Sequence, residues 1–158
     1  MKEMDEAFYK KVMDYRNSEN NPYGQLLQLR VVDIKEGYGR VEIDLHHELM
    51  NSVGIVHGGL LFSIADSASG AAAASRGTKS VTLSGGLNII RKSVGFQKLI
   101  AEAYVVQNGG TISVYDTKIH NENGDLIAEG MYTYFDLHRP LFEDEESTAE
   151  SPEGSEKK

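Results

Sequence analysis

The residues of this chain best suited to chemistry lie in one segment, 51–66, with the sequence NSVGIVHGGLLFSIAD. Gly58 and Gly59 stand at the start of a helical pattern that we expect to run over residues 58–75. The start of a helix leaves backbone N–H groups without intrahelical partners and carries the positive end of the helix dipole. Because glycine lets a ligand approach the backbone closely, this corner could hold an oxyanion.

Asp66 is the only acid in the expected helix, where its neighbours are small or apolar. It lies eight residues beyond Gly58, which is roughly 12 Å along a helix axis. Two groups this far apart cannot act on one carbonyl within a single chain. If both are catalytic, Asp66 must come from a neighbouring subunit, and each site is shared across a two-fold interface. The spacing therefore predicts a dimer.

A carboxylate in this position could act in two ways. It could activate a water molecule as a general base, or attack a carbonyl directly as a nucleophile. The sequence does not choose between these routes. The alternative is an acid that is merely solvated or caps the helix. A capping acid would be placed at the N-terminus of the helix, whereas Asp66 lies two turns beyond it.

The spacing Asn51-x6-Gly58 and Gly58-x7-Asp66 around His57-Gly58-Gly59 resembles the hotdog-fold acyl-CoA thioesterases of the PaaI-like type, over about residues 26–136. The resemblance implies an α+β hotdog fold, in which a curved antiparallel sheet wraps around one long central helix. It also implies hydrolysis of acyl-CoA thioesters to free acid and CoA. No cofactor is expected, because coenzyme A is part of the substrate. A homodimer with shared sites, and a homotetramer built as a dimer of dimers, are the implied assemblies.

The resemblance also assigns roles to single residues. The Gly58 backbone N–H would polarise the thioester carbonyl, and Asn51 would approach that carbonyl or position the water; a turn-forming role is the alternative for Asn51. His57 could be an acid–base catalyst or could orient the loop by hydrogen bonding, and we favour the orienting role. Ser84 would touch the water.

Three further residues are candidates for binding the substrate. Gly59 would allow close packing or close approach of the substrate, and Phe62 would form part of the wall of the acyl pocket. By resemblance Arg91 would meet the phosphates of CoA, and a solvated charge at the end of a strand is the alternative. His46 and His47 have no partner at ligand spacing, so we expect no metal site.

The remaining patterns divide the chain into three parts: an N-terminal helix and linker (1–23, with the helix over 3–18), a hotdog domain (24–138) and an acidic disordered tail (139–158). In the domain, strand-like patterns cover 26–33, 38–45, 79–91, 98–107, 111–120 and 126–136. The Asn-Gly pairs at Asn108-Gly109 and Asn123-Gly124 favour hairpins. From about Phe142 onward the chain has almost nothing to bury.

Composition narrows the function classes. The chain has 158 residues, no cysteine and a net charge of −8, of which residues 142–158 contribute −5 through seven acids and two lysines. Because the chain has no basic face, we do not expect nucleic acid as a partner. No long apolar run suits a membrane, and the acidic N-terminus does not suit a signal peptide, so we expect a cytoplasmic protein.

Two other functions fit hotdog proteins in general. A dehydratase of hydroxyacyl chains pairs a histidine with a more distant acid, and the His-Gly-Gly-x6-Asp run does not fit that arrangement. A non-catalytic acyl-CoA sensor or carrier is the main alternative to a hydrolase. Sensors often carry a DNA-binding module, for which the roughly 20 residues before the first expected strand are too few, and retention of Asp66 favours catalysis.

Overall fold

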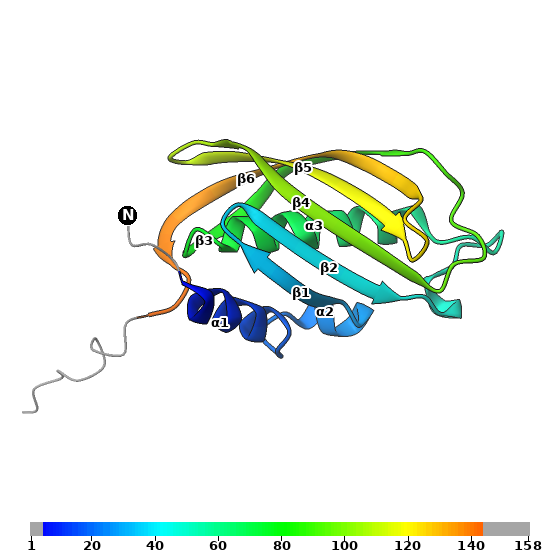
Figure 1. Cartoon of the computed structure of the whole chain (residues 1–158), viewed down its shortest axis with the longest axis horizontal. Helices are drawn as coiled ribbons and strands as arrows, with labels where there is room; N and C mark the ends of the chain where they lie inside the picture. The colour runs from blue at the N-terminus through cyan, green and yellow to red at the C-terminus, as the bar shows by residue number, and fades with distance from the viewer. Residues whose placement is uncertain (1–4, 144–158) are drawn as a thin grey trace, which may run out of the picture.

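The structure is a computed structural model that describes residues 5–143. Three helices, one 3-10 turn and six strands follow one another along the chain (Figure 1). Their bounds are α1 Glu6–Arg16, α2 Pro22–Leu27, β1 Arg30–Lys35, β2 Tyr38–Asp44, η1 His47–Leu49, α3 Gly58–Ala74, β3 Thr78–Ile89, β4 Lys98–Asn108, β5 Ile112–Asn121 and β6 Leu126–Pro140.

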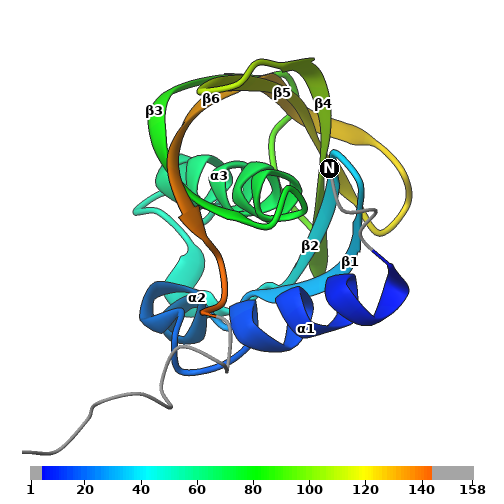
Figure 2. The same ribbon diagram turned by 90° about the vertical axis from the view of Figure 1, so that its left-hand side faces the viewer.

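The six strands form one antiparallel sheet in the order β1-β2-β4-β5-β6-β3. The sheet curves around α3, while α1 and α2 lie on the other side of that helix (Figure 2). The predicted α+β hotdog arrangement is therefore confirmed. Both predicted hairpins are present, since β4 pairs with β5 and β5 pairs with β6.

The composition of α3 explains how the sheet can enclose it. The side chains of Ala65, Ala68 and Ala72 are completely buried, and their small size lets β2 approach the helix backbone. Gly39 of β2 marks the closest contact, because a Cβ atom there would lie only 2.6 Å from both Ala68 O and Ala72 N. The helix is thus held directly against the sheet rather than across a layer of large side chains.

The N-terminal helix α1 packs along β1 with its apolar face inward. Val12 is fully buried, as the helical spacing predicts. The end of the described chain packs on the same helix: the Phe142 ring makes edge-to-face contacts with Phe8 and Tyr15, at centroid distances of 6.2 and 5.5 Å. The expectation that the chain buries almost nothing from Phe142 onward is therefore wrong for Phe142 itself.

A second short helix, α2, occupies the end of the expected linker and the start of the first expected strand. Asn21 caps α2 by accepting a hydrogen bond from the Gly24 N–H at 3.2 Å, and Pro22 occupies the first helical turn. Asn before Pro is a recognised helix-start signal, although both residues lie in the linker expected from the sequence. As a result, β1 begins at Arg30 and not at residue 26.

At the other end, β6 continues to Pro140, past the boundary expected at residue 138. The rest of the predicted disordered tail, residues 144–158, lies outside the described residues. Among residues 5–143, no helix is long and apolar enough to cross a membrane.

The contact between Gly39 and α3 can be tested by adding one methyl group. Gly39→Ala should lower the free energy of unfolding by about 1–3 kcal/mol, since the neighbouring backbone atoms cannot move aside without disturbing the helix. Gly110→Ala is the matched control, because a Cβ there meets no atom within 4 Å. Urea unfolding of both variants at one protein concentration measures the difference. Equal stability of the two variants would contradict the close packing described.

Candidate active site

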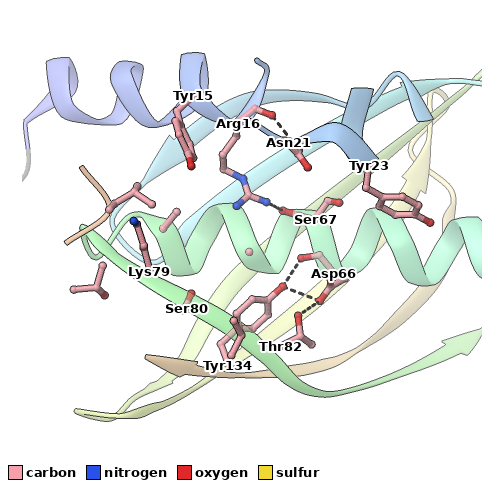
Figure 3. Close-up of a pocket in the computed structure, with 15 residues that line it drawn as sticks. Tyr15, Arg16, Asn21, Tyr23, Asp66, Ser67, Lys79, Ser80, Thr82 and Tyr134 are labelled. Carbon is pink, nitrogen blue, oxygen red and sulfur yellow. Dashed lines mark hydrogen bonds between the residues drawn. The ribbon is translucent and has the colours of Figure 1, made fainter. Parts of the chain in front are cut away.

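Asp66 lies in the middle of α3, with its carboxylate directed toward β3 and β6 (Figure 3). Thr82 Oγ1 donates a hydrogen bond to Oδ1 at 2.8 Å. The Tyr134 hydroxyl lies 2.7 Å from the same Oδ1 and 2.7 Å from the backbone oxygen of Asp66. No donor of residues 5–143 is bonded to Oδ2. One carboxylate oxygen is therefore anchored and the other is free to react.

Two tyrosines of β6 lie near this carboxylate as neutral donors, and one of them, Tyr134, is bonded to it. Burial, and then the nearby Asp66 charge, raise the pKa of the Tyr134 hydroxyl far above its usual value. The same two causes raise the pKa of Tyr132 to about 12, and its hydroxyl donates to the Phe62 backbone oxygen at 3.1 Å. Both hydroxyls keep their protons near neutral pH, so Tyr134 acts as a hydrogen-bond donor beside Asp66.

The hydroxyl that reaches Asp66 comes from Thr82 and not from Ser84. The pairing of β3 with β6 shifts register between Thr82 and Ser84, which is a β-bulge. Beyond the bulge Ser84 pairs with Thr133, whose two neighbours in β6 point toward α3. Paired residues share a sheet face, so Ser84 lies on the opposite face from Asp66. The structure does not bring Ser84 to the carboxylate of its own chain.

The start of α3 has one occupied and one free backbone donor. His57 is the N-cap, and its Nδ1 accepts a hydrogen bond from the Gly59 N–H at 2.9 Å. Because Nδ1 is the acceptor, the proton of the neutral ring is on Nε2. A Cβ on Gly59 would lie 2.9 Å from Nδ1, so this position suits glycine. Within the described chain, the Gly58 N–H has no acceptor. The geometry is that of an orienting His57 beside an open Gly58 donor.

Asn51 holds the loop that precedes α3. Its Oδ1 accepts hydrogen bonds from Val53 N and Ile55 N, at 3.0 and 3.1 Å. Its backbone N–H also donates to the Ile55 oxygen at 2.8 Å. No acceptor among residues 5–143 takes a bond from Nδ2. The side chain thus forms the turn with its oxygen and keeps an amide donor for a ligand.

These loop residues meet at a cavity of about 310 Å³. Asn51, Gly58 and Arg91 all line it, together with Ile89 and Ile90 at the end of β3. Ser93 lines it too, and its Oγ is buried without a hydrogen-bond partner among the described residues. The sequence interpretation did not single out Ser93. Three of the predicted site residues therefore come together here.

Asp66 lines a separate cavity of about 420 Å³. Its walls include Thr82, Tyr134, Arg16 and Lys79 (Figure 3). One chain thus holds the carboxylate and the Gly58 donor at two different cavities, as the helical spacing requires. Gly59 and Phe62 line neither cavity, and the Phe62 side chain is 41% exposed.

The site residues do not form a metal centre in the part of the chain that the structure describes, where no group of three or more His, Cys, Asp or Glu side chains converges. His46 instead hydrogen-bonds Glu48 at 2.8 Å. The chemistry available is that of a carboxylate, backbone and amide donors, and neutral hydroxyls.

Comparison with known proteins identifies the family of the chain. The sequence profile of the thioesterase superfamily matches residues 53–128. A predicted esterase from Archaeoglobus fulgidus is 32% identical over 118 residues, which cover 75% of this chain and 76% of the relative. The acyl-coenzyme A thioesterase PaaI of Escherichia coli is 29% identical over 110 residues, 70% of this chain and 79% of PaaI.

Solved structures show the same fold. The E. coli PaaI structure superposes with a TM-score of 0.77 at 24% identity, covering 84% of this chain and 96% of PaaI. A hypothetical thioesterase from Streptococcus pneumoniae, solved with coenzyme A, gives a TM-score of 0.67 at 26% identity, covering 71% of this chain and 88% of that protein. The chain therefore belongs to the thioesterase superfamily and is a PaaI-like enzyme with the hotdog fold.

Proposed function

We propose that this enzyme hydrolyses acyl-CoA thioesters to a free acid and CoA, at sites built from two chains. Asp66 of one chain activates water or attacks the carbonyl, and the Gly58 N–H of the other polarises it. The observation that carries this proposal is the division of the candidate groups: a carboxylate with a free Oδ2 lies in one cavity, and a free Gly58 donor lies in another.

Both routes convert the thioester and water into a free acid and CoA. In the water route, Asp66 takes a proton from water while the water oxygen attacks the thioester carbon, and the carbonyl oxygen gains negative charge beside the Gly58 N–H. The C–S bond then breaks, and the CoA thiolate leaves and is protonated. In the nucleophilic route, the Asp66 oxygen attacks first, the same bond breaks, and water hydrolyses the resulting anhydride.

A second copy of the chain has an obvious place to bind. β3 lies at the edge of the sheet and pairs on one side only, with β6. It is 12 residues long and exposes three large apolar side chains, Val81, Leu83 and Ile89, and Ile90 directly after it is exposed too; each is at least 46% exposed. A long apolar edge strand is a template for pairing with another strand. We therefore place the dimer contact along β3.

The positions of the two cavities along β3 favour one way for the two copies to pair. Val81 and Thr82, near the start of the strand, line the Asp66 cavity, and Ile89 and Ile90, at its end, line the Gly58 cavity. Antiparallel pairing about a two-fold axis near Gly86 sets Thr82 of one chain opposite Ile90 of the other. The Asp66 cavity of each chain then adjoins the Gly58 cavity of its partner.

Two kinds of observation support binding of the CoA part of the substrate at the Gly58 cavity: the positive charge of the cavity and the ligands of related proteins. Arg91 and Lys92 line the Gly58 cavity and give it two cations suited to phosphate groups. The S. pneumoniae relative was solved with coenzyme A, and PaaI is an acyl-CoA thioesterase by name. These observations support CoA phosphates at this cavity and the acyl group at the Asp66 cavity.

Asp66→Asn should lower the turnover number for acyl-CoA by at least about a hundredfold, because the amide neither takes a proton nor attacks carbon. Binding of acyl-CoA should change much less. Thiol release, followed with a colorimetric reagent, measures turnover. Near-normal turnover at saturating substrate would rule out Asp66 as base or nucleophile. If wild-type enzyme binds acyl-CoA without releasing thiol, the chain is a carrier or sensor instead.

Single turnover in ¹⁸O-labelled water tests the nucleophilic route for the wild-type enzyme. Label in the Asp66 carboxylate, detected by mass spectrometry of the peptide, would show that an anhydride forms and that water attacks its aspartyl carbon. Base catalysis, or attack of water on the acyl carbon of an anhydride, leaves label only in the released acid.

Removing one hydroxyl tests the support given to the carboxylate. Tyr134→Phe should lower kcat/KM by about 10-fold or more, since a hydrogen bond to a charged group is lost. Tyr132→Phe is the matched control, because that hydroxyl donates to a backbone oxygen and not to Asp66; its activity should stay within about threefold of wild type. Equal losses in the two variants would show that Tyr134 does not act through Asp66.

The dimer contact can be trapped, because the chain contains no cysteine. Gly86→Cys should form a disulfide-linked dimer on mild oxidation, since both copies of this residue would lie beside the two-fold axis. A Cβ at Gly86 meets no atom within 4 Å, so the folded chain accommodates the change. Gly110→Cys, away from β3, serves as the control and should cross-link no faster than chance collision allows. A monomer after oxidation of Gly86→Cys would argue against this register.

Mixing inactive variants tests whether the site is shared. Asp66→Asn and Gly58→Val should each be inactive alone, the second because its side chain projects into the cavity beside Ile89. Mixed dimers contain one intact site and should regain activity. Complementation that never exceeds the sum of the two parents would contradict a shared site.

A further inference from the structure

Arg16 is a partly buried cation that the proposed reaction does not use. It lies in the last turn of α1, and its guanidinium points down toward α3 (Figure 3). Its Nη2 donates to the Ser67 backbone oxygen over a long 3.3 Å. Its Nε is buried and has no partner among residues 5–143. A guanidinium carries five N–H donors, so most of this group's bonding capacity is unused.

No carboxylate of the described residues forms an ion pair with Arg16, although nine other pairs are present in residues 5–143. Burial lowers the pKa of the guanidinium, and the nearby Tyr134 and Asp66 oppose that shift. Leaving a buried donor such as the Arg16 Nε–H without an acceptor is costly. Such a group is accounted for when a ligand supplies the missing acceptors.

The guanidinium faces the same cavity as Asp66. That cavity is polar for an acyl pocket, because its walls hold two cations, Arg16 and Lys79, besides Asp66 and several hydroxyl side chains. The hydroxyls of Thr82 and Tyr134 are already bonded to Asp66, and Asp66 is the only carboxylate among the lining residues. A plain hydrocarbon chain would leave the two cations without acceptors, whereas an anionic group would pair with them.

The two groups lie close together beside α3. Gly70, one turn beyond Asp66, lines the same cavity. A Cβ on Gly70 would lie 3.0 Å from Arg16 Nη2 and 3.1 Å from the Tyr134 hydroxyl, so both groups approach the helix backbone at this residue. The guanidinium is therefore a near neighbour of the Asp66–Tyr134 pair, and an acyl chain with its carbonyl at Asp66 could reach it across the shared cavity.

We infer that the acyl group hydrolysed by this enzyme carries a carboxylate at its far end, and that Arg16 of α1 binds this carboxylate and sets the specificity. The inference rests on the proposed thioesterase function and names its substrate class, the ω-carboxyacyl-CoAs. In this arrangement the guanidinium forms a bidentate ion pair with the substrate, and Lys79 adds a second positive charge at the rim. Arg16 takes no part in breaking the C–S bond.

The test compares pairs of substrates that differ only in charge. Succinyl-, glutaryl- and adipyl-CoA are each paired with the neutral isostere in which an isopropyl group replaces the terminal carboxylate. The partner of glutaryl-CoA, for example, is 5-methylhexanoyl-CoA. The measured quantity is the ratio of kcat/KM within each pair. This ratio does not depend on how much of a variant preparation is folded, so partial unfolding cannot imitate the result.

Wild-type enzyme should prefer the carboxylate member of at least one pair. Arg16→Met keeps length and apolar packing but removes the charge, and it should lower that ratio by at least about tenfold while the neutral substrate keeps most of its rate. Arg16→Lys should retain part of the preference. Lys10→Met removes an exposed α1 cation that pairs with Asp14 and should leave the ratio unchanged.

The alternatives give different results. If wild type shows no preference, or Arg16→Met slows both members of each pair equally, Arg16 only fixes α1 on α3 and the inference is overturned, while the proposed function stands. If wild type releases thiol from none of the substrates, the proposed function fails and this inference falls with it.

Discussion

The close contact between the sheet and α3 is the constraint on which the rest of this structure depends. It exists because six of the eleven buried residues of α3 are alanine and because β2 presents Gly39 to the helix backbone. A helix held this closely cannot shift along its axis without clashes. Asp66 therefore stays in register with Thr82 and Tyr134, whose hydroxyls come from two strands of the same sheet. Packing of small side chains thus fixes the position of this carboxylate.

Much of this fold could be predicted from the sequence, for physical reasons that are local. The alternation of apolar and polar residues in β2 and the Asn-Gly turns beside β5 each depend on a few adjacent residues. The start of α3 also carries its own signal, since His57 and the two glycines that follow cap it. The N-terminal region was predicted less well: Asn21-Pro22 begins a helix here, and the same two residues also suit a turn.

The surroundings of Asp66 could not be predicted, because they depend on distant contacts. Tyr134 is 68 residues away in sequence and reaches the carboxylate only through the curvature of β6. The choice between Thr82 and Ser84 depends on a bulge in β3, which reverses the sheet face without leaving a clear mark in the sequence. Arg16 belongs to a helix outside the region that resembles the family. Motif spacing identifies the carboxylate and says little about what surrounds it.

The same motif spacing also explains why chemistry and substrate choice can be separated in this protein. On one helix, the Gly58 donor and Asp66 are too far apart to share a carbonyl, so in the proposed dimer two antiparallel copies of α3 supply them from opposite directions. Asp66 and the Gly58 N–H both belong to α3, and the Thr82 hydroxyl that bonds Asp66 belongs to the edge strand β3. In the proposed dimer, the two-fold pairing fixes the relative positions of these elements. The wall farthest from that pairing comes from α1, where Arg16 contacts the cavity but not the reacting carbon. A change in α1 can therefore alter which acyl group fits, while the carboxylate, its two hydroxyl donors and the Gly58 N–H stay in place.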